Sequence, residues 1–340
     1  APFGLSQALM PLAAGARGTT EAELAKVLQL SVPAIDAADG YAMLSRRLQR
    51  AAGGEAALSF AKALWVQQWN TVNRDFVDLM REHCRSELRV IDFSRGKFAA
   101  HWMNKWIAER TDDLIPAIAD AQTFDESTRL VVGNAVYFKA GWKSEFDPAQ
   151  TTARPFHAAA EPAPVDVPTM RQTAPYRLCA QPGFRLLQLP YRGDRLVMVV
   201  LLPEQGDALP RIESELTADR IAACLRSVHQ AEPARVELSL PRFKADRPVP
   251  QLTTALQEMG AQQIFDRNGA ADLSGLGTNF DGEPIYLSGV SHLAKFVVDE
   301  QGAQAAPASA PAPVAGTDAG GTPVPAPVAW MLASLVSRRA

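Results

Sequence analysis

The stretch that decides the fold runs from Leu130 to Phe146 and reads LVVGNAVYFKAGWKSEF. Its first half is a nearly continuous run of apolar residues, several of them β-branched. Such a run is typical of a strand that is covered on both faces. The stretch therefore predicts a central strand of a β-sheet, with other elements packed against both sides.

Segments typical of strands and of helices surround this central strand. Further strands are predicted near residues 58–68, 87–93, 175–179, 184–191, 195–204, 235–246 and 283–300, and helices near residues 3–30 (in two pieces), 41–51, 73–84, 97–110, 208–226 and 249–260. We find neither an internal repeat nor an interior linker in the sequence. One α+β domain spanning residues 1–340 is therefore predicted, rather than two domains.

Several local features are also predicted. Pro11 should kink or end the first helical piece, because proline cannot donate a backbone hydrogen bond. Thr20 should cap the second piece, with Glu23 completing a capping box. In the helix near residues 97–110, Trp102 and Trp106 should both point inward.

Composition and charge exclude several functional classes. The chain has 340 residues, of which 47% are hydrophobic and 21% charged, and its net charge is −3, so no nucleic acid or anionic membrane is predicted as a partner. No apolar run approaches the roughly 18 residues that a membrane span needs. No signal peptide is visible, and the chain begins at Ala1. Cys84, Cys179 and Cys224 are widely spaced, which argues against a disulfide framework or a metal site.

Motifs of common enzymes are absent from the sequence. Ser274 and Ser288 lack the flanking glycines of a nucleophile elbow, and no HExxH spacing occurs. The glycines of residues 275–282 do not form a dinucleotide-binding fingerprint, and the SRGK at residues 94–97 is not a phosphate-binding loop. We therefore predict no catalytic residue, no metal ligand and no cofactor, and the alternative of a hydrolase assembled from distant residues has no support.

The segment from Gly302 to Ala329 differs in composition from the rest of the chain. It reads GAQAAPASAPAPVAGTDAGGTPVPAPVA, without any aromatic, lysine or arginine residue. Such a segment cannot bury enough apolar surface to offset its ordering entropy, so an exposed mobile loop is expected. On composition alone it is either a Pro/Ala linker or a bait loop carried on a β-sheet.

Six blocks, in order along the chain, carry a resemblance to a known family. They are Ala1–Leu5 with GARGTT (residues 15–20), NAVYFKAGW (134–142) with Phe146, VDVPTM (165–170), LPRFK (240–244), ADLSG (271–275), and the segment from Ser291 to Gly302 that ends in VVDEQG. Over about residues 1–310 this pattern resembles the serpins, the serine protease inhibitor superfamily. The resemblance implies an α+β fold with a large central sheet, a second sheet, surrounding helices and an exposed reactive-centre loop over residues 302–329.

The resemblance also implies a mechanism and a set of site residues. A protease cleaves the loop, and the hinge side of the loop then inserts into the central sheet as a new strand, which traps the protease as an acyl-enzyme. The implied residues are the hinge Glu300, Gly302, Ala303, Ala305, Ala306 and Ala308, the shutter pair Asn134 and His292, the breach residues Trp142, Arg242 and Glu300, and the cleaved bond Gly316–Thr317. We expect His292 and Asn134 to lie within hydrogen-bond reach, and Arg242 and Glu300 to form an ion pair worth about 0–1 kcal/mol.

The chain departs from the family pattern in four places. The family's first helix has no counterpart, Ala1 and Gly4 replace two family serines, and the tail of residues 330–340 does not resemble the family's C-terminal strand pair. The hinge side also carries Pro307, Pro311 and Pro313, which have no N–H for a central strand. These departures leave two hypotheses: a suicide-substrate inhibitor of serine proteases, or a non-inhibitory or truncated serpin-like scaffold.

The residues before the expected cut predict the class of protease. Trypsin-like enzymes need a Lys or Arg immediately before the cleaved bond. No Lys or Arg occurs between Gly302 and Ser337. Val314, Ala315 and Gly316 suit the shallow pockets of elastase-like or subtilisin-like enzymes. By resemblance to the family, we expect an extracellular, secreted protein that is a monomer.

Overall fold

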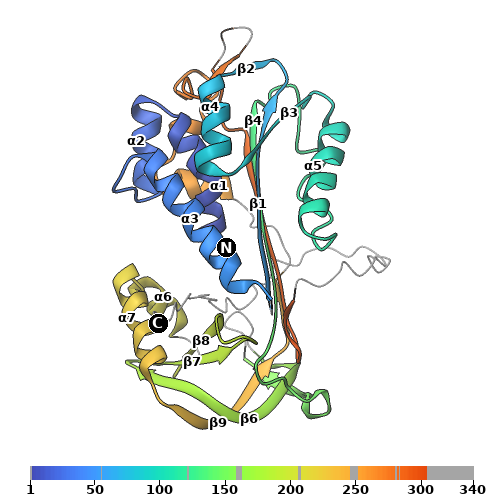
Figure 1. Ribbon diagram of the computed structural model, residues 1–340, viewed down its shortest axis with the longest axis vertical. Coiled ribbons are helices and arrows are strands. Elements are labelled where there is room, and N and C mark those ends of the chain that lie inside the picture. Colours follow the sequence, from blue (N-terminus) through green and yellow to red (C-terminus); the bar gives the residue numbers. More distant parts are fainter. Residues whose placement is uncertain are drawn as a thin grey trace.

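The computed structural model describes residues 2–54, 56–120, 122–157, 163–205, 208–245, 252–279, 282 and 284–304. The chain forms two main β-sheets and a set of helices (Figure 1). Helices cover both faces of the upper part of the longer sheet, and the second sheet lies against its lower part (Figure 1). The α+β class expected from the sequence is confirmed.

The central sheet has six strands, in the order β10-β12-β13-β4-β1-β3. Their bounds are β1 Ala56–Gln67, β3 Glu87–Ile91, β4 Leu130–Gly141, β10 Phe243–Ala245, β12 Gly289–Val298 and β13 Gly302–Gln304. β4 runs antiparallel to β1 on one side and parallel to β12 on the other. The apolar run that begins at Leu130 is therefore an interior strand, as predicted.

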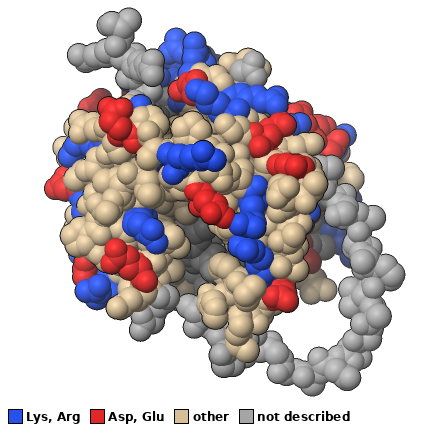
Figure 2. Space-filling model, turned by 90° about the horizontal axis from the view of Figure 1, so that it is seen from below, with Lys and Arg blue, Asp and Glu red and all other residues tan. Residues whose placement is uncertain are grey.

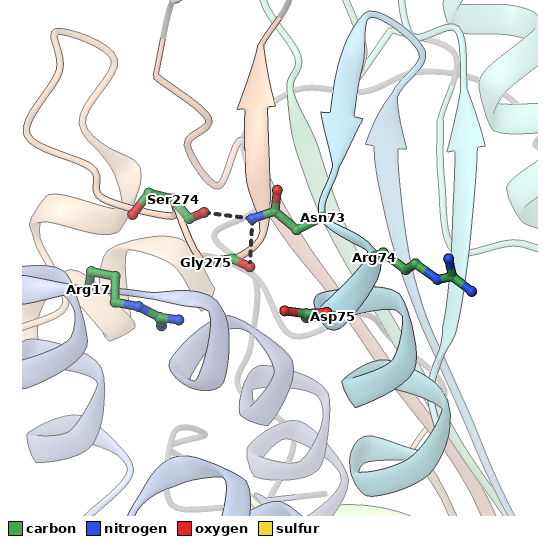
Figure 3. Close-up of a pocket in the computed structure, with 6 residues that line it drawn as sticks. All are labelled: Arg17, Asn73, Arg74, Asp75, Ser274 and Gly275. Carbon is green, nitrogen blue, oxygen red and sulfur yellow. Dashed lines mark hydrogen bonds between the residues drawn. The ribbon is translucent and has the colours of Figure 1, made fainter.

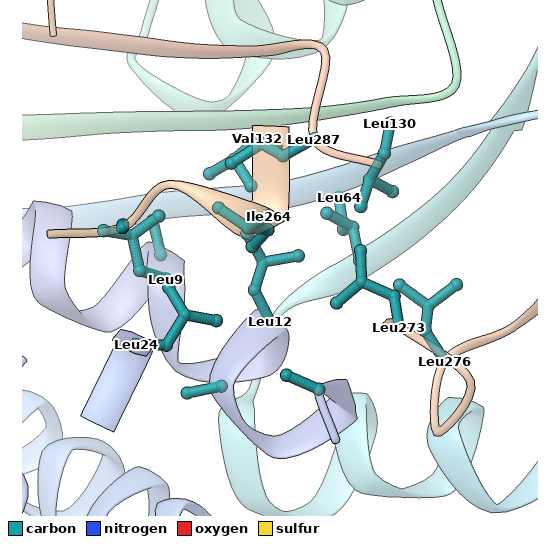
Figure 4. Close-up of a cluster of buried hydrophobic side chains, with 14 of the residues drawn as sticks. Leu9, Leu12, Leu24, Leu64, Leu130, Val132, Ile264, Leu273, Leu276 and Leu287 are labelled. Carbon is teal, nitrogen blue, oxygen red and sulfur yellow. The ribbon is translucent and has the colours of Figure 1, made fainter. Parts of the chain in front are cut away.

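Both faces of β4 are buried because its side chains alternate between two hydrophobic clusters. Leu130 and Val132 pack with α1 (Pro2–Gly15) and α2 (Gly18–Val27), in the cluster shown in Figure 4. Val131 and Ala135 face the other way, toward α5 (Gly96–Arg110), the helix on the opposite side of the sheet in Figure 1. This double burial explains why the strand lacks an apolar–polar alternation.

The remaining elements complete the helical layer and the second sheet. The helices are α3 Ala34–Ala52, α4 Arg74–Leu79, the π-helical turn η1 Met80–Cys84, η2 Pro148–Gln150, α6 Leu209–Glu215, α7 Ala218–Gln230, α8 Leu252–Glu258 and η3 Gln263–Phe265. The second sheet consists of β5 Thr152–Phe156, β6 Val165–Gln181, β7 Phe184–Pro190, β8 Val197–Pro203 and β9 Pro233–Pro241. A small separate ribbon pairs β2 Asn70–Val72 with β11 Gly277–Asn279. A cluster that includes Phe138, Leu189 and Leu240 joins the second sheet to the lower half of the central sheet.

The structure differs from two predictions about the first helices. Pro11 does not end the first helical piece, since α1 continues through it to Gly15, and its buried residues hold the helix against the core despite the lost hydrogen bond. Thr20 lies inside α2 rather than at its cap, and its hydroxyl accepts from Asp272 N at 3.0 Å. Glu23 accepts from the backbone of Gln262 and Gln263, both at 2.8 Å, so its carboxylate caps η3 instead of its own helix.

Two further predictions need correction. Trp102 is 45% exposed on α5, while Trp106 is buried as expected and meets Trp65 edge-to-face at 4.8 Å. The single helix predicted near residues 208–226 is two helices, α6 and α7. The Thr217 hydroxyl accepts from Arg220 N and starts α7, so the capping residue divides the segment.

A glycine in β4 makes room for a buried tryptophan. A Cβ at Gly133 would lie 2.2 Å from Cζ3 of Trp65, which is 1% exposed and has no space to move. Gly133→Ala should therefore lower the free energy of unfolding by roughly 1–3 kcal/mol, as overpacking does in other cores.

Urea unfolding followed by circular dichroism measures this change. The matched control is Gly40→Ala in α3, where no atom lies within 4 Å of the added Cβ. This control should raise stability by about 0.5–1 kcal/mol, because alanine favours helix. If the two substitutions changed the free energy of unfolding equally, the packing of Trp65 would not require the absence of a Cβ at residue 133.

Candidate functional site at the seam of the central sheet

The last described strand, β13, lies between β12 and β4 at one end of the central sheet. Gly302 and Ala303 pair with Gly141 and Ala140 of β4, and on the other side Ala303 pairs with Val298 of β12. Ala303 is fully buried there. The first residues after Glu300 have therefore already begun to add a strand to the sheet.

Gly302 meets a strict steric requirement at this position. A Cβ on Gly302 would lie 2.1 Å from the carbonyl oxygen of Ala140. No side chain can be accommodated at such a distance, so only glycine lets the two backbones approach. Gly302 and Ala303 are thus small enough to fit between two strands of the sheet.

Next to β13, β4 and β12 are paired directly. Seven residue pairs, from Gly289 opposite Val131 to Lys295 opposite Tyr137, form a parallel ladder that we call the seam. The seam closes the space that a longer β13 would occupy. Extension of β13 by further residues therefore requires β4 and β12 to separate pair by pair.

The Glu300 side chain anchors the chain just before β13. Its carboxylate accepts from Arg242 Nε at 2.7 Å and from the Thr151 hydroxyl, and its side chain is 7% exposed. The ion pair expected from the sequence is confirmed. The carboxylate is more deeply buried than that expectation assumed, so removing one partner should cost more than a surface ion pair would.

Two opposing effects act on the pKa of Glu300. Burial raises the pKa, but the hydrogen bonds from Thr151 and Arg242 together outweigh burial and hold the pKa below its ordinary value. The carboxylate is therefore charged at neutral pH. In that state it holds Arg242, beside β10, against the turn that precedes β13.

Trp142 fixes the turn between Glu300 and Gly302. Its indole Nε1 donates to Asp299 O at 2.9 Å, and its backbone N–H donates to Gln301 O, also at 2.9 Å. The indole stacks on Tyr191, with ring centroids 4.7 Å apart and planes 7° from parallel. Because both rings are buried, this stack packs the end of β4 and the turn before β13 against the second sheet.

His292 and Asn134 bridge the middle of the seam. His292 Nδ1 lies 2.8 Å from Asn134 Oδ1, which confirms the contact expected from the sequence. Both residues are buried, and burial lowers the pKa of His292 to about 4. The imidazole is therefore neutral at physiological pH, and the N–H on Nδ1 donates to the amide oxygen. The Asn134 amide also donates, at 3.4 Å, to Ala61 O of β1.

Three residues of the site were not predicted from the sequence, and several predicted residues lie outside the described part of the chain. Thr151 and Tyr191 carried no signal, because their contacts join segments far apart in sequence. Lys62 did carry one, since it is a lone charge inside the apolar strand predicted near residues 58–68. The predicted residues that lie outside the described part of the chain are Ala305, Ala306, Ala308, Gly316 and Thr317, together with Pro307, Pro311 and Pro313.

A separate polar pocket of about 420 Å³ lies between α2, α4 and the loop at residues 274–275 (Figure 3). The amide of Asn73 donates to Ser274 O at 2.9 Å and to Gly275 O at 3.2 Å. The Arg17 guanidinium donates to Ala14 O and Ala16 O at the end of α1. The Asn73 amide therefore joins the start of α4 to the loop at residues 274–275.

The surface, the helices and the metal-binding side chains add three observations. Acidic and basic side chains are interspersed on the end of the molecule shown in Figure 2, with no single sign dominating that face. Every helix in the described part of the chain is too short or too polar to span a bilayer. Within that part, His, Cys, Asp and Glu side chains form no group of three that could hold a metal ion.

The fold thus has a six-stranded sheet in which β13 enters between β4 and β12, and these two strands pair directly beyond it. The family model described as "Serpin (serine protease inhibitor)" matches residues 1–328. The chain belongs to the serpin family. It is 32% identical to a serpin-like protein of Thermococcus kodakarensis, over 91% of this chain and 69% of that protein. It is 30% identical to a leukocyte elastase inhibitor of Xenopus laevis, over 91% and 81% of the two chains.

Solved structures show the same fold. Serpin48 of the insect Tenebrio molitor matches with a TM-score of 0.74 and 28% identity, over 92% of this chain and 82% of that one. Uncleaved ovalbumin matches with a TM-score of 0.77 and 25% identity, over 88% and 83% of the two chains. The serpin fold expected from the sequence is confirmed.

Glu300→Gln tests the anchor at the hinge. The substitution keeps the shape and removes the charge, so it should lower the free energy of unfolding by roughly 1–2 kcal/mol at pH 7. Because the folded pKa of Glu300 is depressed, this difference is complete above the ordinary carboxyl range and disappears as the pH falls through the folded pKa. Urea unfolding at pH 7 and in acid measures both effects.

The matched control is Glu145→Gln. Glu145 pairs with Arg192 nearby, but both side chains are about half exposed. Its loss should change stability by less than about 0.5 kcal/mol. If Glu145→Gln lowered the free energy of unfolding more than Glu300→Gln did, the Glu300 carboxylate would not anchor the chain before β13.

The buried imidazole should make the fold acid-sensitive. Since the pKa of His292 is about 4 in the folded chain and about 6.5 when unfolded, the unfolded chain binds a proton first as the pH falls. Stability should therefore decrease between pH 6.5 and 4, by on the order of 3 kcal/mol from this group. His292→Gln, which still offers a donor to Asn134, should lack this component. The exposed His101 supplies the control His101→Gln, and identical pH profiles of the His292 variant and the wild type would refute the assignment.

Proposed function

We propose that the chain inhibits serine proteases as a suicide substrate, with residues 302–329 as the reactive-centre loop. The observation that carries this proposal is the position of β13. It occupies the first places of an added strand between β12 and β4, while the seam next to it is still closed. A sheet arranged in this way gains backbone hydrogen bonds if the seam opens and the strand lengthens.

The covalent step follows from the chemistry of serine proteases. The protease hydroxyl attacks the carbonyl of the residue before the cut, an ester forms, and the amine of the next residue leaves. The loop ahead of the cut is then joined only to the protease and to β13. Its insertion would pull the acyl-enzyme along the sheet and distort its active site before water completes hydrolysis.

Several residues would perform named steps. Glu300 and Trp142 hold the start of the hinge, Gly302 and Ala303 lead the strand into the sheet, and Asn134 with His292 must part for it to pass. Ala305, Ala306 and Ala308 would follow, because small side chains fit easily into a sheet interior. Gly316–Thr317 is the proposed cleaved bond, and Val314 to Gly316 favour elastase-like or subtilisin-like targets. A secreted monomer is part of the same proposal.

A second candidate function is a serpin scaffold whose loop is only a protease substrate. The hinge prolines favour it, because Pro307, Pro311 and Pro313 cannot donate to a central ladder. Similarity to ovalbumin and to thyroxine-binding globulin gives the fold but does not choose between the two candidates. Trapping of the protease separates them.

The test is to incubate the chain separately with an elastase, a subtilisin and trypsin. The inhibitor hypothesis expects a covalent complex with one of the first two that survives denaturing electrophoresis, and none with trypsin. Gly316→Arg should add trapping of trypsin, because arginine then occupies the position before the cut.

The matched control is Gly320→Arg, which offers trypsin a cut four residues further along. The longer loop ahead of the cut should delay or weaken distortion, so this variant should be cleaved with much less trapping. Cleavage of every variant with complete release of active protease would establish the substrate hypothesis instead.

A further inference from the structure

Lys62 is a buried cation in line with the seam. It lies in β1 directly opposite Asn134 of β4, and Asn134 in turn lies opposite His292 of β12. All three residues are less than 9% exposed. A lysine, an amide and an imidazole thus form one polar row across three neighbouring strands.

The Lys62 and Asn134 side chains point to the same face of the sheet. Lys62 is two residues from Leu64, which belongs to the cluster under α1. A Cβ built on Gly4 of α1 would lie 3.0 Å from Asn134 Oδ1, so Asn134 faces α1 as well. Directly opposed residues have Cβ atoms about 4.5–5.5 Å apart, which places the Asn134 oxygen within reach of a lysine side chain.

The lysine ammonium has donors to spare. Its Nζ donates to Cys84 O at 2.9 Å, the carbonyl at the end of η1, where the helix dipole favours a cation. The ammonium carries more N–H groups than one carbonyl accepts. A second acceptor on the same face can therefore be bound without loss of the first.

We propose that Lys62 is a positioning residue for strand insertion: when the seam opens and His292 leaves Asn134, the Lys62 ammonium donates to the freed Asn134 oxygen. This inference rests on the proposed function, because it describes how the seam would open for the loop. A buried amide oxygen without a donor is costly, so a replacement donor lowers the free energy of the opened sheet. A charged donor lowers it more than a neutral one.

The exchange depends on pH through the charge on Lys62. Burial lowers the pKa of Lys62 to about 8 in the closed sheet, and a new acceptor would raise the pKa in the opened sheet. The contribution is then complete below about pH 8 and disappears as the pH rises through the pKa of the opened sheet.

The charged and titratable groups around Lys62 come from each neighbouring element. Cys84 and Arg85 lie at the end of η1, and burial raises the pKa of the Cys84 thiol to about 12, so it stays neutral. Asp39 of α3 pairs with His83 at the surface. His292 is neutral above about pH 4, because burial and then the positive charge of the N-terminal amino group lower its pKa, and α1 carries no titratable side chain. Lys62 is therefore the group of this row that changes charge near pH 8.

Native-state hydrogen exchange tests the proposal without any protease. The readout is the opening of the seam, measured at the amides of residues 131–137 and 289–295 and compared with those of β7 and β8. Lys62→Met keeps the length of the side chain and removes the donor. Relative to β7 and β8, its seam amides should exchange about tenfold more slowly at pH 7 than those of the wild type.

Two controls make the result specific. Lys139→Met removes a charge from an exposed position of β4 and should leave the seam unchanged. Lys62→Gln keeps a neutral donor and should fall between Lys62→Met and the wild type. Seam exchange in Lys62→Met that equals or exceeds that in Lys139→Met would overturn the proposal.

The wild-type chain supplies a second measurement that needs no variant. After correction for intrinsic exchange, opening of its seam should decrease between pH 7 and pH 9, while β7 and β8 show no such trend. A seam whose opening is independent of pH in this range would also overturn the proposal. Neither result depends on trapping a protease, so failure here is distinguishable from failure of the proposed inhibition.

Discussion

Backbone pairing across one seam is the constraint on which the rest of the structure depends. Up to Tyr137, β4 pairs directly with β12. From Ala140 onward, β13 lies between these two strands and β4 pairs with β13 instead. Under the proposed function, a second arrangement of the sheet would differ from this one in how far β13 extends. Pairing gained by β13 favours the longer arrangement, whereas the closed ladder and the polar contacts across it favour the observed one.

Polar side chains hold the sheet at the start of β13 and in the middle of the seam. Just before β13, Glu300 is held by Arg242 and Thr151, and Trp142 fixes the adjoining turn. In the middle of the seam, His292 binds Asn134 in a buried row that Lys62 extends to the next strand. Buried hydrogen bonds of this kind suit a switch, because each is strong when made and costly when left unsatisfied. Opening the seam would therefore break a defined set of buried contacts.

Sequence reasoning predicted the parts of the fold that depend on local pattern. The run from Leu130 showed that β4 is an interior strand, and the resemblance brought Asn134 to His292 and Arg242 to Glu300 although each pair is far apart in sequence. Sequence reasoning failed where contacts with a distant segment determine what a residue does. Glu23 caps η3 rather than α2, and Thr20 binds Asp272, because those backbone donors approach only in the folded chain. Pro11 stays helical for the same reason, since packing outweighs its local preference.

We expect the observed arrangement of the sheet to be less stable than one with the loop inserted. Thermal unfolding of the intact chain and of the chain nicked once within residues 314–317, with the two fragments kept together, compares the two arrangements. The nicked protein should unfold at a markedly higher temperature, because β13 has lengthened between β4 and β12. An unchanged or lower unfolding temperature after the nick would show that the loop does not insert.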